Sequence, residues 1–131
     1  MKKIKQILSI SLLSCMMFTS CTKTATDDAS KFAGTWTGTS CGSASTFTLT
    51  KVNNTTLTTS GTVGNGTCTK AVTITHTASG NNLTVPSQTF TDNCANSYTF
   101  SGSGSLSGNT LTITETVSGS INLTCTFTGT K

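Results

Sequence analysis

The sequence predicts an all-β protein, an antiparallel up-and-down meander of about eight strands that closes into a barrel. From Lys31 onward, apolar and hydroxylated residues alternate with a period of two, as they do in half-buried antiparallel strands. Threonine makes up about a quarter of the chain and Pro86 is the only proline. The branched β-carbon of threonine favours strands over helices, so the composition supports the same fold class and predicts no helix.

The chain opens with a segment typical of bacterial export. Lys2, Lys3 and Lys5 form a cationic head, and an uncharged run over residues 7–18 follows it. The run covers about a dozen residues, fewer than the ~20 that a transmembrane helix needs. A cleaved signal over residues 1–20 is therefore expected rather than a membrane-spanning anchor.

The end of this segment, Phe18-Thr19-Ser20-Cys21, resembles the signal of lipid-anchored proteins of Gram-negative bacteria. The resemblance implies that Cys21 is lipidated and becomes the first residue after cleavage, and that acyl chains hold the protein in the outer membrane, on its periplasmic or cell-surface face. Leu12-Leu13-Ser14-Cys15 offers a competing site, but its use would leave a very short apolar core. Residues 21–30 then read as the lipidated cysteine with a flexible tether, and residues 31–131 as one β domain.

Charge excludes one class of partner. Once the three lysines of the signal are removed, five lysines stand against four acids, and the chain has no arginine. Nucleic-acid binding is not expected, because phosphate recognition needs clustered lysine or arginine. The nearly neutral domain is expected to contact the membrane through its lipid, and its protein partners are not defined by the sequence.

Eight strands can be placed by their alternating apolar positions. The markers in chain order are Phe32, Gly34, Trp36 and Gly38; Phe47 and Leu49; Leu57 and Val63; Val72 and Ile74; Leu83 and Val85; Tyr98 and Phe100; Leu111, Ile113 and Val117; Ile121, Leu123, Cys125 and Phe127. Threonine and serine fill most positions between them and suit a solvated face.

A weak repeat supports hairpin connections between these strands. The stretch from Ser79 to Val85 nearly matches that from Ser107 to Ile113, and residues 53–58 form a looser copy. Gly and Asn in each copy suit tight hairpin turns, which predicts turns at one end of a meander rather than the coils of a solenoid. Closure into a barrel would remove exposed strand edges, and a two-sheet sandwich is the alternative.

The segment from Phe32 to Thr39 contains Gly34-x-Trp36 and resembles the start of lipocalin-like domains. In that family the tryptophan closes the barrel floor, and the strand count and turns are similar to those of small lipocalin-like lipoproteins. Larger members pack an arginine of the last strand on the tryptophan, and this chain has none. Strands of about seven residues would make the barrel shallow.

Four cysteines follow the signal segment, namely Cys41, Cys68, Cys94 and Cys125. In an exported chain they predict two disulfides, because no Cys-x-x-Cys pair or nearby histidine offers the spacing of a zinc site. In a closed meander the first and last strands pair, which favours Cys41–Cys125. Cys68 and Cys94 would lie near turns at one end, which favours their pairing. Each cysteine is in phase with neighbouring apolar residues, which predicts side chains that face the interior.

Residues for catalysis are few. His76 is the only histidine, and it shares phase with Val72 and Ile74 as Glu115 does with Leu111 and Ile113. Both are candidates to point into the lumen and contact a small ligand. The alternatives are that they are hydrated at strand ends or satisfy each other. No nucleophile-elbow motif accompanies them, so we expect no catalytic residue, no metal and no cofactor.

These observations predict a lipid-anchored, non-catalytic envelope protein, a binding or accessory module for a small apolar ligand. The alternative is a structural or surface-adhesion protein without a small-molecule ligand. A cavity that fits a ligand would favour the first, and a filled core with an exposed apolar patch the second.

Overall fold

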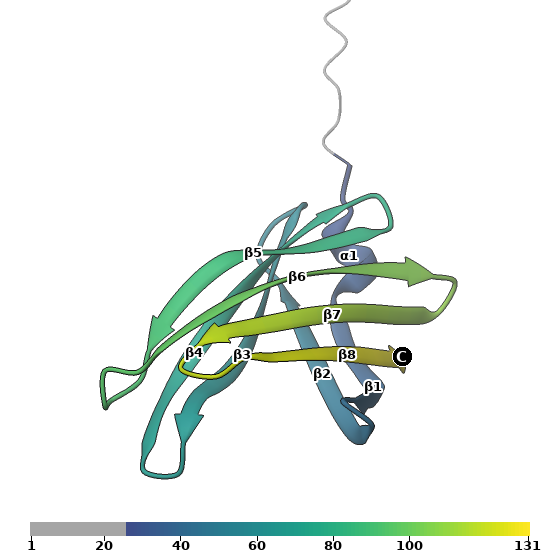
Figure 1. Cartoon of the computed structure of the whole chain (residues 1–131). Helices are drawn as coiled ribbons and strands as arrows, with labels where there is room; N and C mark the ends of the chain where they lie inside the picture. Colours follow the sequence, from purple (N-terminus) through teal and green to yellow (C-terminus); the bar gives the residue numbers. More distant parts are fainter. Residues whose placement is uncertain (1–25) are drawn as a thin grey trace, which may run out of the picture.

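The computed structural model describes residues 26–131, so the predictions on the signal segment and on Cys15 and Cys21 lie outside the described residues. One short helix and eight strands make up the fold (Figure 1). They are α1 (Ala29–Phe32), β1 (Gly34–Ser40), β2 (Ser43–Lys51), β3 (Thr56–Asn65), β4 (Cys68–Ser79), β5 (Asn82–Thr91), β6 (Ser97–Ser107), β7 (Thr110–Gly119) and β8 (Leu123–Thr130).

The strands form a closed antiparallel barrel in which each pairs with the next and β8 pairs with β1. The predicted meander is therefore confirmed, and the sandwich and the solenoid are not observed. The first strand has the expected seven residues, but the other strands are longer, and β4 reaches 12 residues. The eighth strand begins at Leu123 rather than at Ile121.

Three turns of the repeat lie at one end of the barrel, which we call the closed end. They are the β2–β3, β4–β5 and β6–β7 connections, as an up-and-down meander requires. Gly80 and Gly108 have φ of 60° and 57° in two of them, a left-handed conformation that glycine adopts without steric cost. The opposite end, formed by the other four connections, is the mouth.

Helix α1 covers the closed end and corrects two expectations. The sequence predicts no helix and a tether up to Ser30, but Ala29 and Phe32 are fully buried. The Ala29 N–H donates to the carbonyl of Asn54 at 2.9 Å, and the Gly80 N–H donates to Asp28 at 2.8 Å. A single helical turn has little stability of its own, so these contacts with the turns explain a helix that the local sequence does not reveal.

Trp36 forms the floor of the barrel next to α1. It is fully buried, and its indole N–H donates to the carbonyl of Phe32 at 2.8 Å. The Lys131 ammonium lies 4.6 Å from the centre of the indole ring and donates to the carbonyls of Lys31 and Ala33 at 2.9 Å each. A lysine cation thus lies over the face of the tryptophan ring.

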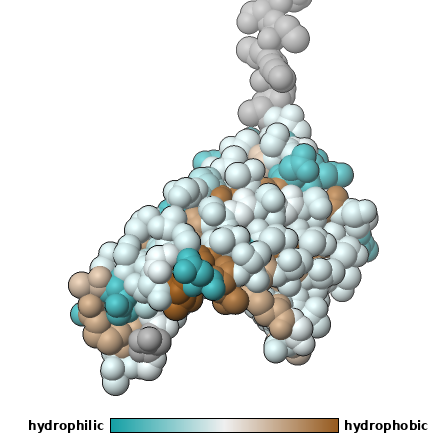
Figure 2. Space-filling view, viewed as in Figure 1, coloured by the Kyte–Doolittle hydropathy of each residue, from teal (hydrophilic) through white to brown (hydrophobic). Residues whose placement is uncertain are grey.

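The wall of the barrel is joined unevenly. Ten residue pairs connect β3 to β4 and ten connect β6 to β7. Only four connect β1 to β8, three connect β4 to β5 and two connect β2 to β3. The β1–β2 and β3–β4 hairpins diverge away from α1 in Figure 1, and Figure 2 shows a hollow between two lobes at this side of the molecule.

Two disulfides, Cys41–Cys125 and Cys68–Cys94, have the pairing that the meander favours. The predicted inward phase is wrong for Cys41 and Cys94, which are exposed. Cys41 lies in the β1–β2 turn and Cys94 in the β5–β6 loop. The loops shift the register that the alternation within the strands had indicated.

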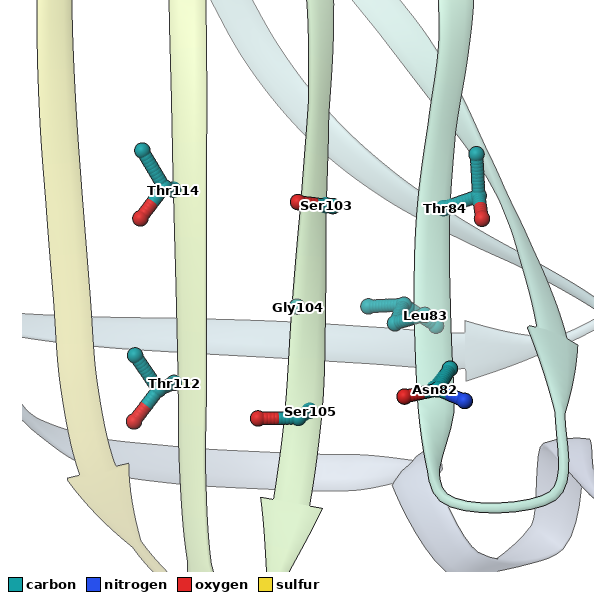
Figure 3. A pocket seen from close by; sticks show the side chains of 8 residues that line it. All are labelled: Asn82, Leu83, Thr84, Ser103, Gly104, Ser105, Thr112 and Thr114. Atoms are coloured by element: carbon teal, nitrogen blue, oxygen red, sulfur yellow. The ribbon is translucent and has the colours of Figure 1, made fainter.

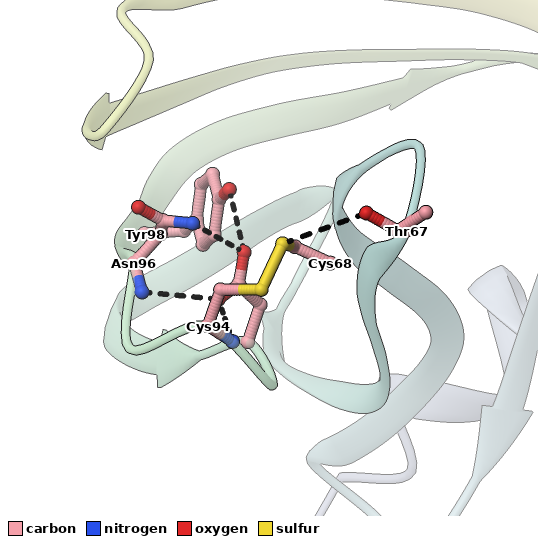
Figure 4. Close-up of a disulfide and its surroundings, with 6 residues drawn as sticks. Thr67, Cys68, Cys94, Asn96 and Tyr98 are labelled. Atoms are coloured by element: carbon pink, nitrogen blue, oxygen red, sulfur yellow. Dashed lines mark hydrogen bonds between the residues drawn. A yellow bond between two sulfur atoms is a disulfide. The ribbon is translucent and has the colours of Figure 1, made fainter.

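Figure 4 shows the surroundings of Cys94, Asn96 and Tyr98, and the loop that carries Cys94 is organised by one buried carboxylate, Asp92. Asp92 accepts hydrogen bonds from the N–H groups of Cys94 and Asn96, the Asn96 amide and the Tyr98 hydroxyl, at 2.8–3.0 Å. Burial would raise the pKa of Asp92, but these donors outweigh it and hold the pKa below its usual value. The carboxylate therefore stays charged and fixes the loop on which the disulfide closes.

Candidate functional site in the barrel interior and mouth

The register places the inward-facing side chains in layers. Residues opposite each other in paired strands share a face of the sheet, so Leu106, Leu111 and Gly129 form one layer near the closed end. Gly104, Ile113 and Phe127 form the next layer, followed by Gly102, Glu115 and Cys125 and then by Phe100, Val117 and Leu123 towards the mouth.

The closed half of the barrel is filled. Its largest side chains are at most 1% exposed and consist of Phe32, Trp36, Leu49, Leu57, Leu83 and Leu111. This half resembles an ordinary packed core, so any binding space lies nearer the mouth.

His76 faces the interior from β4, as predicted, and is fully buried. Its ring stands edge-on to Phe47 with 5.9 Å between ring centres. Neither ring nitrogen has a hydrogen-bond partner. Burial lowers the pKa of His76 from 6.5 to about 4, so the imidazole is neutral at pH 7. The two alternatives, hydration at a strand end and a bond to Glu115, are not what the structure shows.

Glu115 also faces the interior, from β7, and it is half-buried. Burial raises the pKa of its carboxyl group above the usual value, and Oε1 has no hydrogen-bond partner. A cavity of about 50 Å³ adjoins it, lined by Ser40, Ser45, Phe47, Ile113, Glu115, Cys125 and Phe127. Since a water molecule occupies about 30 Å³, the cavity fits one or two waters or a small chemical group.

The mouth above Glu115 is apolar and open. Phe100 and Val117 are partly buried, and their row continues to Leu123, which is 49% exposed. Phe90 packs edge-on against Phe100 at 5.8 Å. Ile121, in the β7–β8 turn, is 45% exposed, and Figure 2 shows hydrophobic residues beside the hollow. The mouth can contact an apolar group but does not enclose one.

A separate groove lies on the outer surface of β5, β6 and β7 (Figure 3), with a volume of about 390 Å³. Five of its eight lining residues carry hydroxyl groups, namely Thr84, Ser103, Ser105, Thr112 and Thr114. None of the eight is charged or aromatic. The groove offers hydrogen bonds but no large side chain that would hold a ligand by burial.

Sequence reasoning did not identify Phe47, Asp92, Gln88 or Lys131 as important to the site and its walls. The one signal in the sequence was Pro86, because a proline inside a strand pattern marks an edge or a bulge. The structure has that bulge between Val85 and Gln88. The roles of Phe47 and Lys131 depend on contacts between residues far apart in the chain. Asp92 makes its bonds within its own loop, but no motif in the sequence indicated them.

Within residues 26–131, His, Cys, Asp and Glu form no group of three that could ligate a metal. The same residues contain no helix with the length and hydropathy needed to cross a bilayer.

Comparison with family models, with curated proteins and with solved structures returned no match. The fold established for this chain is thus an eight-stranded, closed, antiparallel up-and-down β-barrel.

Proposed function

We propose that this protein is a lipid-anchored, non-catalytic binding module of the bacterial outer membrane, and that its barrel mouth receives an apolar group. The export signal ending at Cys21 supports the anchor. The observation that carries the binding role is the apolar row Phe100–Val117–Leu123 at the open mouth, directly above the half-buried Glu115.

The size of the interior limits the ligand. Enclosed sites for drug-sized ligands measure about 300–1,000 Å³, whereas the cavity beside Glu115 measures about 50 Å³. A ligand would insert only a small end, such as a methyl or short alkyl group, and leave the rest at the mouth. The Glu115 carboxyl group lines this cavity and can form a hydrogen bond with a polar atom of the ligand.

A lipocalin-like assignment is part of this proposal. Trp36 on the floor with the Lys131 cation over its ring is similar to the tryptophan and arginine of the larger members.

A non-catalytic role is supported by the state of the two interior titratable residues. His76 has no partner that orients its ring, and no hydrogen bond joins it to Glu115. A histidine that acts as a general base is normally held by a second group and lies within reach of a nucleophile.

The mouth can be tested with N-phenyl-1-naphthylamine, an uncharged apolar probe whose fluorescence rises on binding. Residues 22–131, produced under oxidising conditions, should bind it, and Ile121→Thr with Leu123→Thr should weaken binding at least tenfold. The matched control is Val52→Thr, because Val52 is 60% exposed at the closed end. Equal binding by all three proteins would remove the mouth as the site.

The alternative, a structural or surface-adhesion protein, is favoured by the outer face. Threonine hydroxyls pair across strands at 2.9–3.1 Å in Thr35–Thr48, Thr89–Thr99, Thr114–Thr126 and Thr116–Thr124. Binding of the isolated barrel to purified envelope glycans or proteins, unaffected by the Ile121 and Leu123 substitutions, would support this role instead.

A further inference from the structure

We propose that the joint between β2 and β3 is a docking site for an extended polypeptide segment, which pairs with the open strand edges as an added β-strand. The inference concerns the side wall of the barrel and does not rest on the role of the mouth.

The joint leaves two strand edges without a partner. Only Thr50–Thr58 and Lys51–Leu57 pair across it, so residues 43–49 of β2 and 59–65 of β3 have no partner strand on this side. On their other sides β2 has seven pairs with β1 and β3 has ten with β4. The open edges therefore belong to strands that are otherwise fixed.

The direction of the backbone groups follows from strand geometry. In an antiparallel ladder, alternate residues direct both N–H and C=O to the same neighbour. The carbonyl of Thr48 accepts a hydrogen bond from the Thr59 hydroxyl across the joint. Thr46, two residues before Thr48, therefore also directs its N–H and C=O towards β3.

A groove of about 350 Å³ occupies the joint. Its lining residues are Thr46, Phe47, Thr48, Thr50, Thr59 and Ser60, none of them charged. Backbone groups and hydroxyls form its rim, and the half-buried Phe47 ring lies on its inner side. This chemistry fits a polypeptide backbone with an apolar side chain directed at Phe47 and small polar side chains directed outward.

The other two thin joints are closed by specific links. The β1–β8 joint carries the disulfide Cys41–Cys125. The β4–β5 joint is closed by Cys68–Cys94 and by the Gln88 amide. That amide accepts from the Thr75 N–H at 2.8 Å and donates to the Thr75 carbonyl at 2.9 Å. The β2–β3 joint has the fewest pairs and no disulfide, and the Thr59 hydroxyl that donates to the Thr48 carbonyl is the one side-chain hydrogen bond described across it.

The β2 and β3 edges also lack the features by which proteins protect open strands. Proline, lysine and bulges at an edge discourage pairing with another chain. The β5 strand has Pro86 and a bulge where it leaves β4, whereas residues 43–50 and 58–64 contain no proline and no charged residue. An unprotected edge accepts an added strand, which is an established mode of peptide recognition.

The test selects nine-residue peptides from a random phage library against the full-length oxidised protein in a non-ionic detergent. Selected peptides should alternate apolar and polar residues. Thr46→Pro removes an N–H that faces the joint and should weaken their binding at least tenfold, whereas Thr46→Val keeps that N–H and should change it less than twofold.

If the Thr46→Pro variant does not fold, hydrogen exchange of the unsubstituted protein provides an independent test. In the unsubstituted protein, peptide binding should slow exchange of the Thr46 N–H at least tenfold and leave amides shared by β6 and β7 unchanged. Failure to select any peptide, equal binding by the proline and valine variants, or protection only outside β2 and β3 would each overturn the proposal.

Discussion

His76 should make the barrel less stable as the pH falls from 7 to 4. The imidazole is fully buried beside Phe47, and both of its nitrogens lack partners. A buried imidazolium without an anion is unfavourable, which is why burial lowers the pKa of His76 from 6.5 to about 4. The unfolded chain takes up a proton near pH 6.5, but the folded protein does not until about pH 4.

The sign and size of the effect follow from this difference. Because folding lowers the pKa of His76, the contribution of the neutral imidazole to the free energy of unfolding is present in full above pH 6.5. It is lost as the pH falls towards about 4. Between pH 7.5 and pH 4.5 the loss is about 2.5 kcal/mol, from about 1.4 kcal/mol per unit of pKa difference and the partial protonation at the lower pH. That is a large share of the ~5–15 kcal/mol that stabilises a typical domain.

Two variants separate the charge of His76 from its polarity. His76→Gln keeps a polar side chain that does not titrate, and His76→Leu removes the polar atoms. The assay is urea unfolding followed by the fluorescence of the single tryptophan. Both variants should lack the loss of about 2.5 kcal/mol in unfolding free energy between pH 7.5 and pH 4.5. Since about 1.4 kcal/mol corresponds to a factor of ten in the folding equilibrium, the difference is readily measured. The leucine variant should also be about 1–3 kcal/mol more stable at pH 7, because unsatisfied buried atoms are gone.

Glu115 requires a control in these measurements. Burial raises the pKa of its carboxyl group, so its contribution is present below the unfolded value and is lost as the pH rises through the folded value, opposite in sign to that of His76. Repeating the comparison in Glu115→Gln removes this contribution. Parallel pH curves for the histidine protein and both variants would refute the reasoning, as would a midpoint near pH 6.5 for the single histidine in proton NMR.

Three further outcomes are expected. Reduction of both disulfides should lower the melting temperature or abolish folding, since loops of 84 and 26 residues correspond to about 4.6 and 3.5 kcal/mol in the chain-entropy model; equal melting in circular dichroism with and without reductant would contradict this. Gln88→Leu should destabilise the barrel by about 1–3 kcal/mol and speed exchange of the Thr75 N–H, and unchanged exchange would show that the amide does not close the joint. Cys21→Ala should abolish palmitate labelling and processing whereas Cys15→Ala should not, and the reverse result would place the lipid on Cys15.

The fold could be predicted from the sequence because its determinants are local. Alternation of apolar residues with threonine sets the strands, and Gly-Asn turns set hairpins, so the meander follows from patterns within short segments. The meander in turn favours both disulfide pairings. The helix at Ala29–Phe32 could not be predicted, since the turns that hold it come from residues about 25 and 50 positions later. The role of Lys131 could not be predicted either, because its ammonium group lies over the ring of Trp36, which is 95 positions earlier in the chain.

The candidate site was predictable only in part. The period of two correctly directed His76 and Glu115 inward. It could not show how closely the side chains fill the lumen, which depends on packing across the barrel. The period of two also did not show that the three joints with few pairs differ. The number of pairs across a joint depends on where two neighbouring strands separate in the closed barrel, and the sequence of each strand does not reveal that point.

The position of the proposed anchor gives the two proposed binding surfaces an orientation. If Cys21 carries the lipid, residues 22–25 separate it from the described residues, and the five residue steps from Cys21 to Thr26 span at most about 18 Å when fully extended. The chain enters the barrel at α1, on the closed end. The closed end would then lie next to the membrane, and the mouth and the widening β2–β3 joint would face away from it. Such an arrangement leaves both surfaces accessible to a ligand or a polypeptide that arrives from the aqueous side.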